Sequence, residues 1–374
     1  MAYAFIDLKR QYEILEKEIS QAVAKVLDSG QFIGGAAVTD FEKALADFVG
    51  VGHAIGCGNG TSSMEMALMA LNVGPGDAVF CPSFTFIATA EVIALRGAEP
   101  IFVEIDPLTY NIDPADLSTK IQAVKKAGRL IPRAIIPVDL FGLPADYLAI
   151  EAIAAEHELF ILEDAAQGFG GSIKGRRAGS FGQAGSTSFF PAKPLGCYGD
   201  GGALFTNDAA LAETLRSIRT HGSGIEKYEH VRLGTNSRLD AIQAAVLSVK
   251  LKAFPWELDE RQRVAARYSA ALASQMPVPH IPETYFSSWA QYTVRVPAEK
   301  RLNIMEFLKS KGVPTMIYYP KPLHLQPAFA SLGGRAGDLP VSELASAEVL
   351  SLPMHPYLKD EEIDQICGFL LEAV

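Results

Sequence analysis

Two hydrophobic spacings alternate along the first 250 residues. Segments with apolar positions three and four residues apart predict helices, and short apolar runs between turns predict buried strands. Helices are predicted over residues 11–28, 39–48, 62–71, 87–96, 117–127 and 146–157, and strands over 53–57, 78–81, 100–103, 134–139, 159–162 and 187–190. Thr39, with Glu42 three residues later, is the predicted cap of the second helix. Short apolar strands separated by helices predict an α/β fold whose sheet is mostly parallel.

The pattern changes near residue 250. Two helices, 240–253 and 257–273, are predicted on either side of Phe254-Pro255-Trp256, followed by segments at 290–296, 314–319 and 359–371 that form a smaller α+β unit. With 374 residues the chain is long enough for two domains. We therefore predict an N-terminal segment and large domain over residues 1–250 and a small C-terminal domain over 251–374.

Composition excludes several classes of protein. A net charge of −10 without a basic run argues against nucleic acid as a partner. The start of the chain, Met1–Leu8, has no sustained apolar stretch, so we expect neither a signal peptide nor a membrane anchor. The four cysteines are scattered and no histidines have metal-ligand spacing, which predicts reduced thiols, a cytoplasmic protein and no bound metal.

Candidate chemistry begins with Lys193 and Asp164, each of which follows a predicted strand. A lysine and a carboxylate at the ends of two strands of one sheet can converge on one ligand. A lysine amine condenses with an aldehyde, and a carboxylate pairs with a protonated pyridine nitrogen. Pyridoxal 5'-phosphate (PLP) requires both groups from a protein. Taken alone, such a lysine is more often a solvated loop residue.

Other short motifs are consistent with the same ligand. Gly56-Cys-Gly-Asn-Gly-Thr-Ser62 joins a predicted strand to a helix, whose N-terminus can hold a phosphate. The same glycines also fit a plain tight turn, while a dinucleotide fingerprint would need a third glycine and a later acid. Phe86 lies at a strand-to-helix junction and can stack on a flat ring or belong to the core. Gln167 can hydrogen-bond a ring oxygen, and Ser188 can donate to a phosphate.

Together these motifs resemble one family. Glu163-Asp-Ala-Ala-Gln167, Ser188-Phe-Phe-Pro-Ala-Lys-Pro-Leu-Gly196, Gly199-Asp-Gly-Gly202 and Gly234-Thr-Asn-Ser-Arg-Leu-Asp240 resemble the DegT/StrS-type sugar-nucleotide aminotransferases. The resemblance extends from Phe5-Ile-Asp-Leu-Lys9 to Leu352-Pro-Met-His-Pro356. It implies the fold type I architecture of aspartate aminotransferase, PLP as cofactor, L-glutamate as amino donor and a homodimer.

The resemblance also implies residue roles. Lys193 would bind the cofactor covalently and later move a proton, and Asp164 would pair with the ring nitrogen. The remaining cofactor contacts would be made by Gly60, Thr61, Phe86, Gln167 and Ser188, with Asn236 reaching the cofactor of the neighbouring subunit.

The implied amino acceptor is a nucleotide-linked ketosugar. Within the family the chain is similar to enzymes that aminate C3 of UDP-2-acetamido-2-deoxy-3-keto-glucuronic acid, which implies a role in surface polysaccharide (lipopolysaccharide O-antigen) synthesis. Candidate substrate contacts are Arg10, Arg232, Arg238, Tyr318, Tyr319 and His324. A 3-keto- or 4-keto-6-deoxy sugar remains an alternative, because the catalytic residues are shared. A non-catalytic regulatory relative is a further alternative, although it would have little reason to retain Asp164, Gln167 and Lys193.

Overall fold

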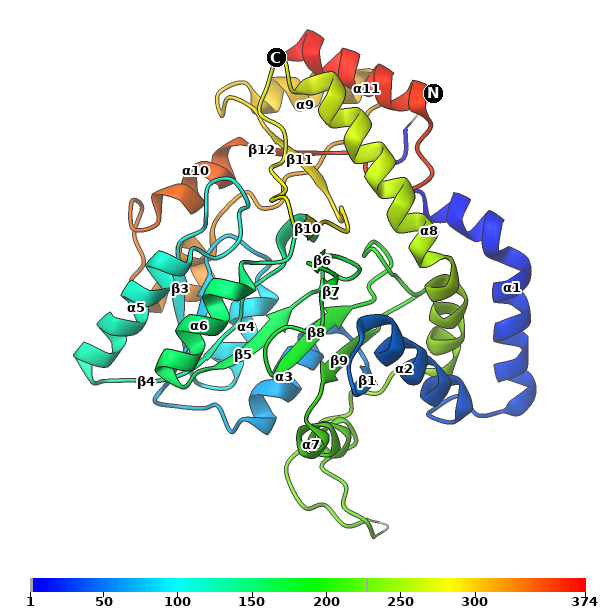
Figure 1. Cartoon of the computed structure of the whole chain (residues 1–374), viewed down its shortest axis with the longest axis vertical. Helices are drawn as coiled ribbons and strands as arrows, with labels where there is room; N and C mark the ends of the chain where they lie inside the picture. Colours follow the sequence, from blue (N-terminus) through cyan, green and yellow to red (C-terminus); the bar gives the residue numbers. More distant parts are fainter. Residues whose placement is uncertain (1–2, 227) are drawn as a thin grey trace.

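A central sheet organises the molecule (Figure 1). The structure is a computed structural model that describes residues 3–226 and 228–374, so Met1 and Ala2 of the N-terminal segment lie outside it. Within these residues the sheet has seven strands in the order β1-β9-β8-β5-β4-β2-β3. Their bounds are β1 His53–Cys57, β2 Asp77–Pro82, β3 Glu99–Val103, β4 Ile131–Ile135, β5 Phe160–Asp164, β8 Ala184–Ser188 and β9 Gly202–Thr206.

The sheet is mostly parallel, as predicted. The exception is β9, which runs antiparallel to both β1 and β8 and was not predicted. The strand predicted over 187–190 is also misplaced, because β8 ends at Ser188. Phe189 is fully buried in the core just beyond the strand, so its apolar side chain extended the pattern past the true end.

Helices cover both faces of the sheet. Alternate residues of β2 point to opposite sides, so Val79 and Cys81 join one core cluster while Ala78 and Phe80 join another. The first cluster includes residues of α3 (Gly60–Ala70), α4 (Ala88–Leu95) and α7 (Ala209–Arg219). The second includes residues of α5 (Pro114–Ala127) and α6 (Tyr147–His157). Strands covered on both faces are expected for a parallel sheet with crossover helices.

The first two helices are α1 (Leu8–Ser29) and α2 (Ala36–Val49). The predicted cap at Thr39 is wrong, because α2 begins earlier and Gly35 is its N-cap. Thr39 Oγ1 instead donates to backbone carbonyls of the preceding turn. Glu42 accepts from the backbone N–H of Gly56 at 2.8 Å and pairs with Arg219, so a tertiary contact replaces the predicted capping contact.

One helix, α8, spans Ala241–Leu272 with Pro255 inside it, so the prediction of two separate helices is wrong. Proline removes one backbone hydrogen bond, but packing on both sides of it maintains the helix. Phe254 and Leu258 pack against the core of the large unit, while residues from Val264 onwards pack against the C-terminal unit. The predicted domain boundary near 250 therefore falls within a continuous helix, and the division into two domains remains a proposal.

The C-terminal unit forms the upper part of Figure 1. Its antiparallel pair β11 (Tyr292–Arg295) and β12 (Val349–Leu352) shares a core cluster with α9 (Arg301–Ser310) and α11 (Asp360–Ala373). The remaining helix, α10 (Pro340–Glu348), contributes Ala345 to the cluster that contains Val349. The segment 314–319, predicted as part of this unit, contributes a single bridge, between Met316 and Ser351. The smaller elements are β6 (Ser172–Ile173), β7 (Arg176–Arg177), β10 (Tyr285–Phe286) and the 3-10 helices η1 (Leu140–Gly142), η2 (Leu323–Leu325) and η3 (Pro327–Leu332).

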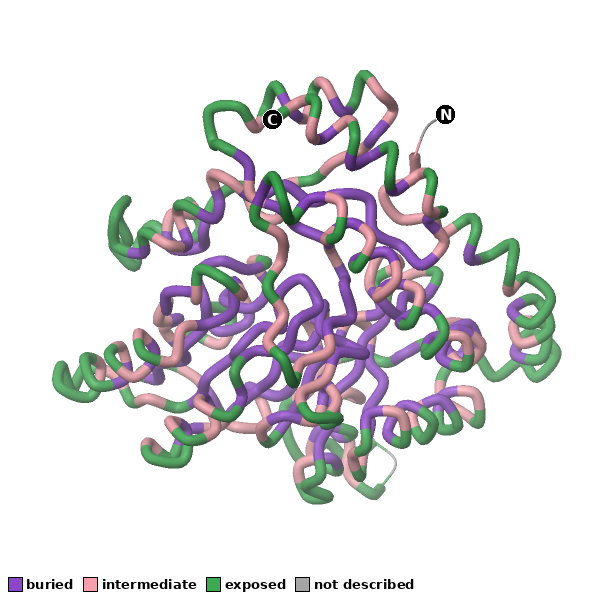
Figure 2. The backbone as a smooth tube through the Cα atoms, turned by 45° about the horizontal axis from the view of Figure 1, so that its top comes forward, coloured by how far each residue is buried: buried purple, intermediate pink, exposed green. Residues whose placement is uncertain are grey.

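Burial follows this architecture, with buried residues concentrated along the strands of the central sheet and exposed residues on the outer helices (Figure 2). Among the helices of the described residues, none combines the length and apolar character needed to cross a membrane.

Candidate active site

A cavity of about 610 Å³ lies beyond the carboxyl ends of β2, β5 and β8. Open α/β sheets commonly bind ligands at this edge. The cavity is lined by nine of the residues predicted from the sequence: Gly60, Thr61, Phe86, Asp164, Gln167, Ser188, Lys193, Tyr318 and Tyr319. The tertiary structure thus brings together groups that are up to 259 positions apart, from Gly60 to Tyr319.

Lys193 lies on the loop that follows β8. Its backbone N–H donates to the carbonyl of Phe190 at 2.8 Å, which fixes the turn that directs the side chain. Burial lowers the pKa of Lys193, and the Asp164 carboxylate opposes that shift. A lysine whose charge is disfavoured by burial is a better nucleophile near neutral pH than a solvated one.

Asp164 ends β5, and the donors around it favour its charged form. Burial raises the pKa of Asp164, while hydrogen bonds from Thr89 and Ala166 and the charge of Lys193 lower it. Thr89 Oγ1 donates to Asp164 Oδ2 at 2.9 Å, and the Ala166 N–H donates to Oδ1 at 3.2 Å. Sequence reasoning assigned no role to Thr89, because its partner lies 75 positions away.

The N-terminus of α3 forms one wall of the cavity. The Asn59 side chain caps this helix by accepting from the Ser62 N–H at 2.7 Å. This cap leaves the N–H groups of Gly60 and Thr61 available to an anion, at the positive end of the helix dipole. A Cβ at Gly60 would come within 2.8 Å of Ser188 Cβ, so glycine allows the helix to approach β8 closely.

Aromatic and amide groups form the opposite wall. Gln167 Oε1 accepts from the Phe141 N–H at 2.7 Å, and its Nε2 donates to the Tyr319 hydroxyl at 3.0 Å. The Phe86 ring is half exposed within the cavity wall, 6.0 Å from the Tyr319 ring. Phe86 is therefore not a core residue, and its face is available to a flat ligand.

Five predicted residues do not line this cavity. Arg232, Asn236 and Arg238 are exposed on the segment between α7 and α8, and the intervening Ser237 accepts from the Gly58 N–H beside the cavity. Arg10 is exposed on α1 and pairs with Glu13 at 3.4 Å. His324 is buried, where its Nδ1 meets Ser83 Oγ at 2.7 Å and its Nε2 meets Glu343 at 3.2 Å. This arrangement places His324 in the supporting structure.

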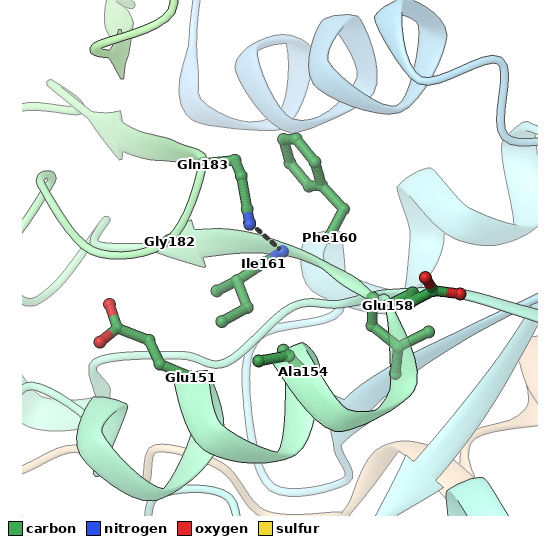
Figure 3. A pocket seen from close by; sticks show the side chains of 9 residues that line it. Glu151, Ala154, Glu158, Phe160, Ile161, Gly182 and Gln183 are labelled. Atoms are coloured by element: carbon green, nitrogen blue, oxygen red, sulfur yellow. Dashed lines mark hydrogen bonds between the residues drawn. The ribbon is translucent and has the colours of Figure 1, made fainter.

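A second hollow, of about 500 Å³, lies between α6 and the start of β5 (Figure 3). Its charged lining residues are Glu151 and Glu158, and Glu151 already pairs with Arg176. Gln183 accepts from the Ile161 N–H, so its amide is also engaged. An acidic hollow without a lysine does not suit a phosphorylated aldehyde.

The larger cavity contains the groups that PLP requires. The N–H groups of Gly60 and Thr61 at the start of α3 and the Ser188 hydroxyl suit a phosphate. The Asp164 carboxylate suits a protonated ring nitrogen, and the half-exposed Phe86 suits the face of the ring. Lys193 supplies the amine. These groups come from separate elements around one cavity, so the described residues fit the cofactor.

Comparisons with known proteins agree with this chemistry. The family model described as the DegT/DnrJ/EryC1/StrS aminotransferase family matches residues 13–371. The chain therefore belongs to this family of PLP-dependent aminotransferases.

Individual relatives resemble nearly the whole chain. A UDP-2-acetamido-2-deoxy-3-oxo-D-glucuronate aminotransferase from Pseudomonas aeruginosa is 48% identical over 98% of this chain and 99% of its own length. A pleiotropic regulatory protein from Geobacillus stearothermophilus is 47% identical over 97% of this chain and 96% of its own length.

Solved structures share the fold type I architecture. A DegT DnrJ EryC1 StrS aminotransferase from Brucella abortus has a TM-score of 0.97 and 51% identity, covering 99% of both chains. A Bacillus subtilis structure with bound cofactor PMP has a TM-score of 0.90 and 30% identity, covering 100% of this chain and 85% of that one.

Proposed function

We propose that this aminotransferase moves the amino group of L-glutamate to C3 of UDP-2-acetamido-2-deoxy-3-keto-glucuronic acid. The observation that carries this proposal is the 48% identity, over nearly the full length of both chains, to the Pseudomonas aeruginosa enzyme named for that substrate. The product would enter the synthesis of a surface polysaccharide such as O-antigen.

In this proposal each cavity residue has one task. PLP, when bound, supplies an aldehyde and a ring that accepts electrons. With the cofactor bound, the Lys193 amine would take up and release the proton that moves during amino transfer. Asp164 would hold the proton of the ring nitrogen, and Thr89 donates to Asp164 and favours its charged form. Gly60, Thr61 and Ser188 would bind the phosphate, and Phe86 and Gln167 would orient the ring.

A C6 carboxylate on the sugar would need a cation. The arginines on the segment between α7 and α8, Arg232 and Arg238, are exposed and form no ion pair within the described residues, whereas Arg10 pairs with Glu13. An arginine binds a carboxylate through two parallel hydrogen bonds. We propose Arg238 as the principal candidate, because it follows Ser237, which contacts Gly58 beside the cavity. Tyr318 and Tyr319 line the cavity and would contact the sugar, whereas His324 is buried against Ser83 and Glu343.

The decisive experiment compares nucleotide ketosugars that differ only at C6. An arginine–carboxylate contact contributes about 1.5–3 kcal/mol. The kcat/KM for the ketosugar with a C6 carboxylate should therefore be about one to two orders of magnitude higher than that for its C6-hydroxyl analogue. Arg238→Gln should reduce that preference with little effect on the neutral sugar. Equal efficiencies, or a preference for a 4-keto-6-deoxy sugar, would contradict the uronic acid proposal and leave the aminotransferase assignment intact.

Two alternatives have specific support. A relative named dTDP-3-amino-3,4,6-trideoxy-alpha-D-glucose transaminase is 40% identical over 95% of this chain, which supports a deoxy sugar as the second candidate substrate. The relative named as a regulatory protein supports a non-catalytic role. Against that role, Asp164, Gln167 and Lys193 converge on one cavity.

We also infer a homodimer with shared sites. The hairpin between α7 and α8 exposes apolar residues, with Ile225 and Leu233 at 97% and 89% exposure, and it protrudes beneath α7 in Figure 1. Apolar side chains on a protruding segment are typical of an interface. Asn236 lies on the same hairpin, is exposed, and is not among the residues that line the cavity of its own chain.

The buried, unpaired cysteines support a reducing compartment such as the cytoplasm.

A further inference from the structure

Two buried carboxyl groups lie directly behind the cavity. Glu163 precedes Asp164 on β5, and Asp139 lies on the neighbouring chain segment, where its N–H donates to the Asp164 carbonyl at 3.0 Å. Both side chains are fully buried. Because successive residues of a strand point to opposite faces, Glu163 points away from the cavity that Asp164 lines. Neither carboxyl has been assigned a role so far.

The hydrogen bonds of these carboxyls leave one oxygen without a donor. Glu163 accepts from the N–H groups of Gly179 and Phe181 at 2.6 and 2.8 Å. Asp139 Oδ1 accepts from the Ala145 N–H at 3.0 Å and the Tyr147 hydroxyl at 2.9 Å. Asp139 Oδ2 is buried and receives no N–H or O–H from the described residues.

The two carboxyl groups are neighbours, and each acts on the pKa of the other. The buried Asp139 Oδ2 gains a donor if one of the two carboxyls carries a proton. Burial raises the pKa of both groups, and the charge of Asp164 raises that of Asp139 further. The other titratable groups that face Asp139 are Tyr147 on α6 and Tyr285 on β10, neither of which is a cation. Two adjacent buried anions without a cation would be strongly unfavourable.

We propose that Asp139 and Glu163 share one proton as a carboxylic acid–carboxylate pair, and that this pair positions Asp164 and Gln167 while adding a single negative charge behind the cavity. The positioning follows from the contacts. The Asp139 side chain fixes the turn through Ala145 and Tyr147, and this turn contains Phe141, whose N–H orients Gln167. The inference concerns the cofactor side of the site and is independent of which sugar the enzyme accepts.

The shared proton determines the direction in which the free energy of unfolding changes with pH. Unfolded carboxyls have a pKa near 4, so above that pH the folded pair holds about one proton more than the unfolded chain. Stability therefore decreases as pH rises, until the folded pair also loses its proton. The unfolding equilibrium constant should rise about tenfold per pH unit from this proton alone.

Asp139→Asn tests this prediction, because the amide oxygen can accept from Ala145 and Tyr147 while the amide N–H₂ donates to Glu163 without an acid proton. Both proteins are measured saturated with PLP. Between pH 5 and neutral pH, we expect the unfolding equilibrium constant of the wild type to rise about tenfold per pH unit relative to that of the variant. Asp208→Asn, at the exposed N-cap of α7, is the matched control and should parallel the wild type. An infrared difference spectrum between wild type and Asp139→Asn should contain the carbonyl band of a protonated carboxyl.

Positioning is tested by cofactor binding. Asp139→Asn should keep the PLP dissociation constant within about twofold, whereas Asp139→Ala, which leaves Ala145 and Tyr147 without an acceptor, should weaken it by about tenfold or more. Parallel pH–stability curves for wild type and Asp139→Asn, together with no protonated-carboxyl band, would overturn the shared proton. Wild-type PLP affinity in a folded Asp139→Ala variant would overturn the positioning role. Neither result would alter the substrate proposal, which depends on a different assay.

Discussion

At the scale of single residues, the chemistry of the site depends on how each charge is solvated by the protein. Asp164 is buried, and burial alone would favour its neutral form. Hydrogen bonds from Thr89 and Ala166 and the charge of Lys193 favour the carboxylate, which is the form that pairs with a cationic ring. Lys193 experiences the reverse balance, since burial disfavours its charge and Asp164 favours it. The two groups therefore regulate each other's protonation.

This balance predicts a graded pair of variants. Asp164→Asn removes the anion and should reduce kcat by about two to three orders of magnitude, because a preorganised charge is lost. Thr89→Val removes one donor to the carboxylate, which should raise the pKa of Asp164 and shift the acidic limb of the pH–rate profile to higher pH. Thr206→Val, a buried threonine that donates to the neutral Gln183 carbonyl, is the matched control. Near-normal turnover of folded, PLP-loaded Asp164→Asn would contradict this account.

At the scale of elements, the site requires the N-terminus of α3 to approach the end of β8 closely. Asn59 caps the helix, and Gly60 has no side chain that would collide with Ser188. The sequence Gly-Asn-Gly was also compatible with an ordinary turn. Only the contact with β8 shows that the second glycine is required by packing.

Gly60→Ala tests that packing. The added Cβ would lie 2.8 Å from Ser188 Cβ, so either the helix or the strand must shift. We expect PLP affinity to fall by about tenfold, since phosphate contacts depend on sub-ångström placement, while the circular dichroism spectrum remains that of the wild type. Gly368→Ala in α11, where no atom lies within 4 Å of the new Cβ, is the control and should bind PLP normally. Unchanged PLP affinity in Gly60→Ala would show that the clearance is not needed.

At the scale of the whole molecule, Asn236 lies on the exposed hairpin and is not among the residues that line the cavity of its own chain. In the proposed dimer, Asn236 would reach the cavity of the second copy. Obligate interfaces of this kind bury on the order of 2,000 Å² or more. The hairpin's exposed apolar residues are consistent with such burial.

Mixed dimers distinguish shared sites from separate ones. A subunit with Asn236→Ala, paired with a subunit carrying Lys193→Ala, should contain one intact site if Asn236 acts across the interface. Activity should then return to about half that of the wild-type dimer, while each homodimeric variant stays far less active. If Asn236 serves its own chain, both sites of the mixed dimer lack one residue. The mixture would then show no recovery, which would contradict the shared site.

The sequence by itself determined the fold class, the parallel core and most of the cofactor cavity, because these depend on local periodicity and on short motifs at strand ends. Lys193 and Asp164 could be placed together because each follows a predicted apolar strand, and parallel strands end at a common edge of the sheet. The tertiary structure alone decided contacts between distant residues. Glu42 pairs with Arg219 rather than capping its helix, and His324 is held between Ser83 and Glu343. Thr89 and the Asp139–Glu163 pair gain their roles from partners on other elements, and periodicity contains no information about which elements become neighbours.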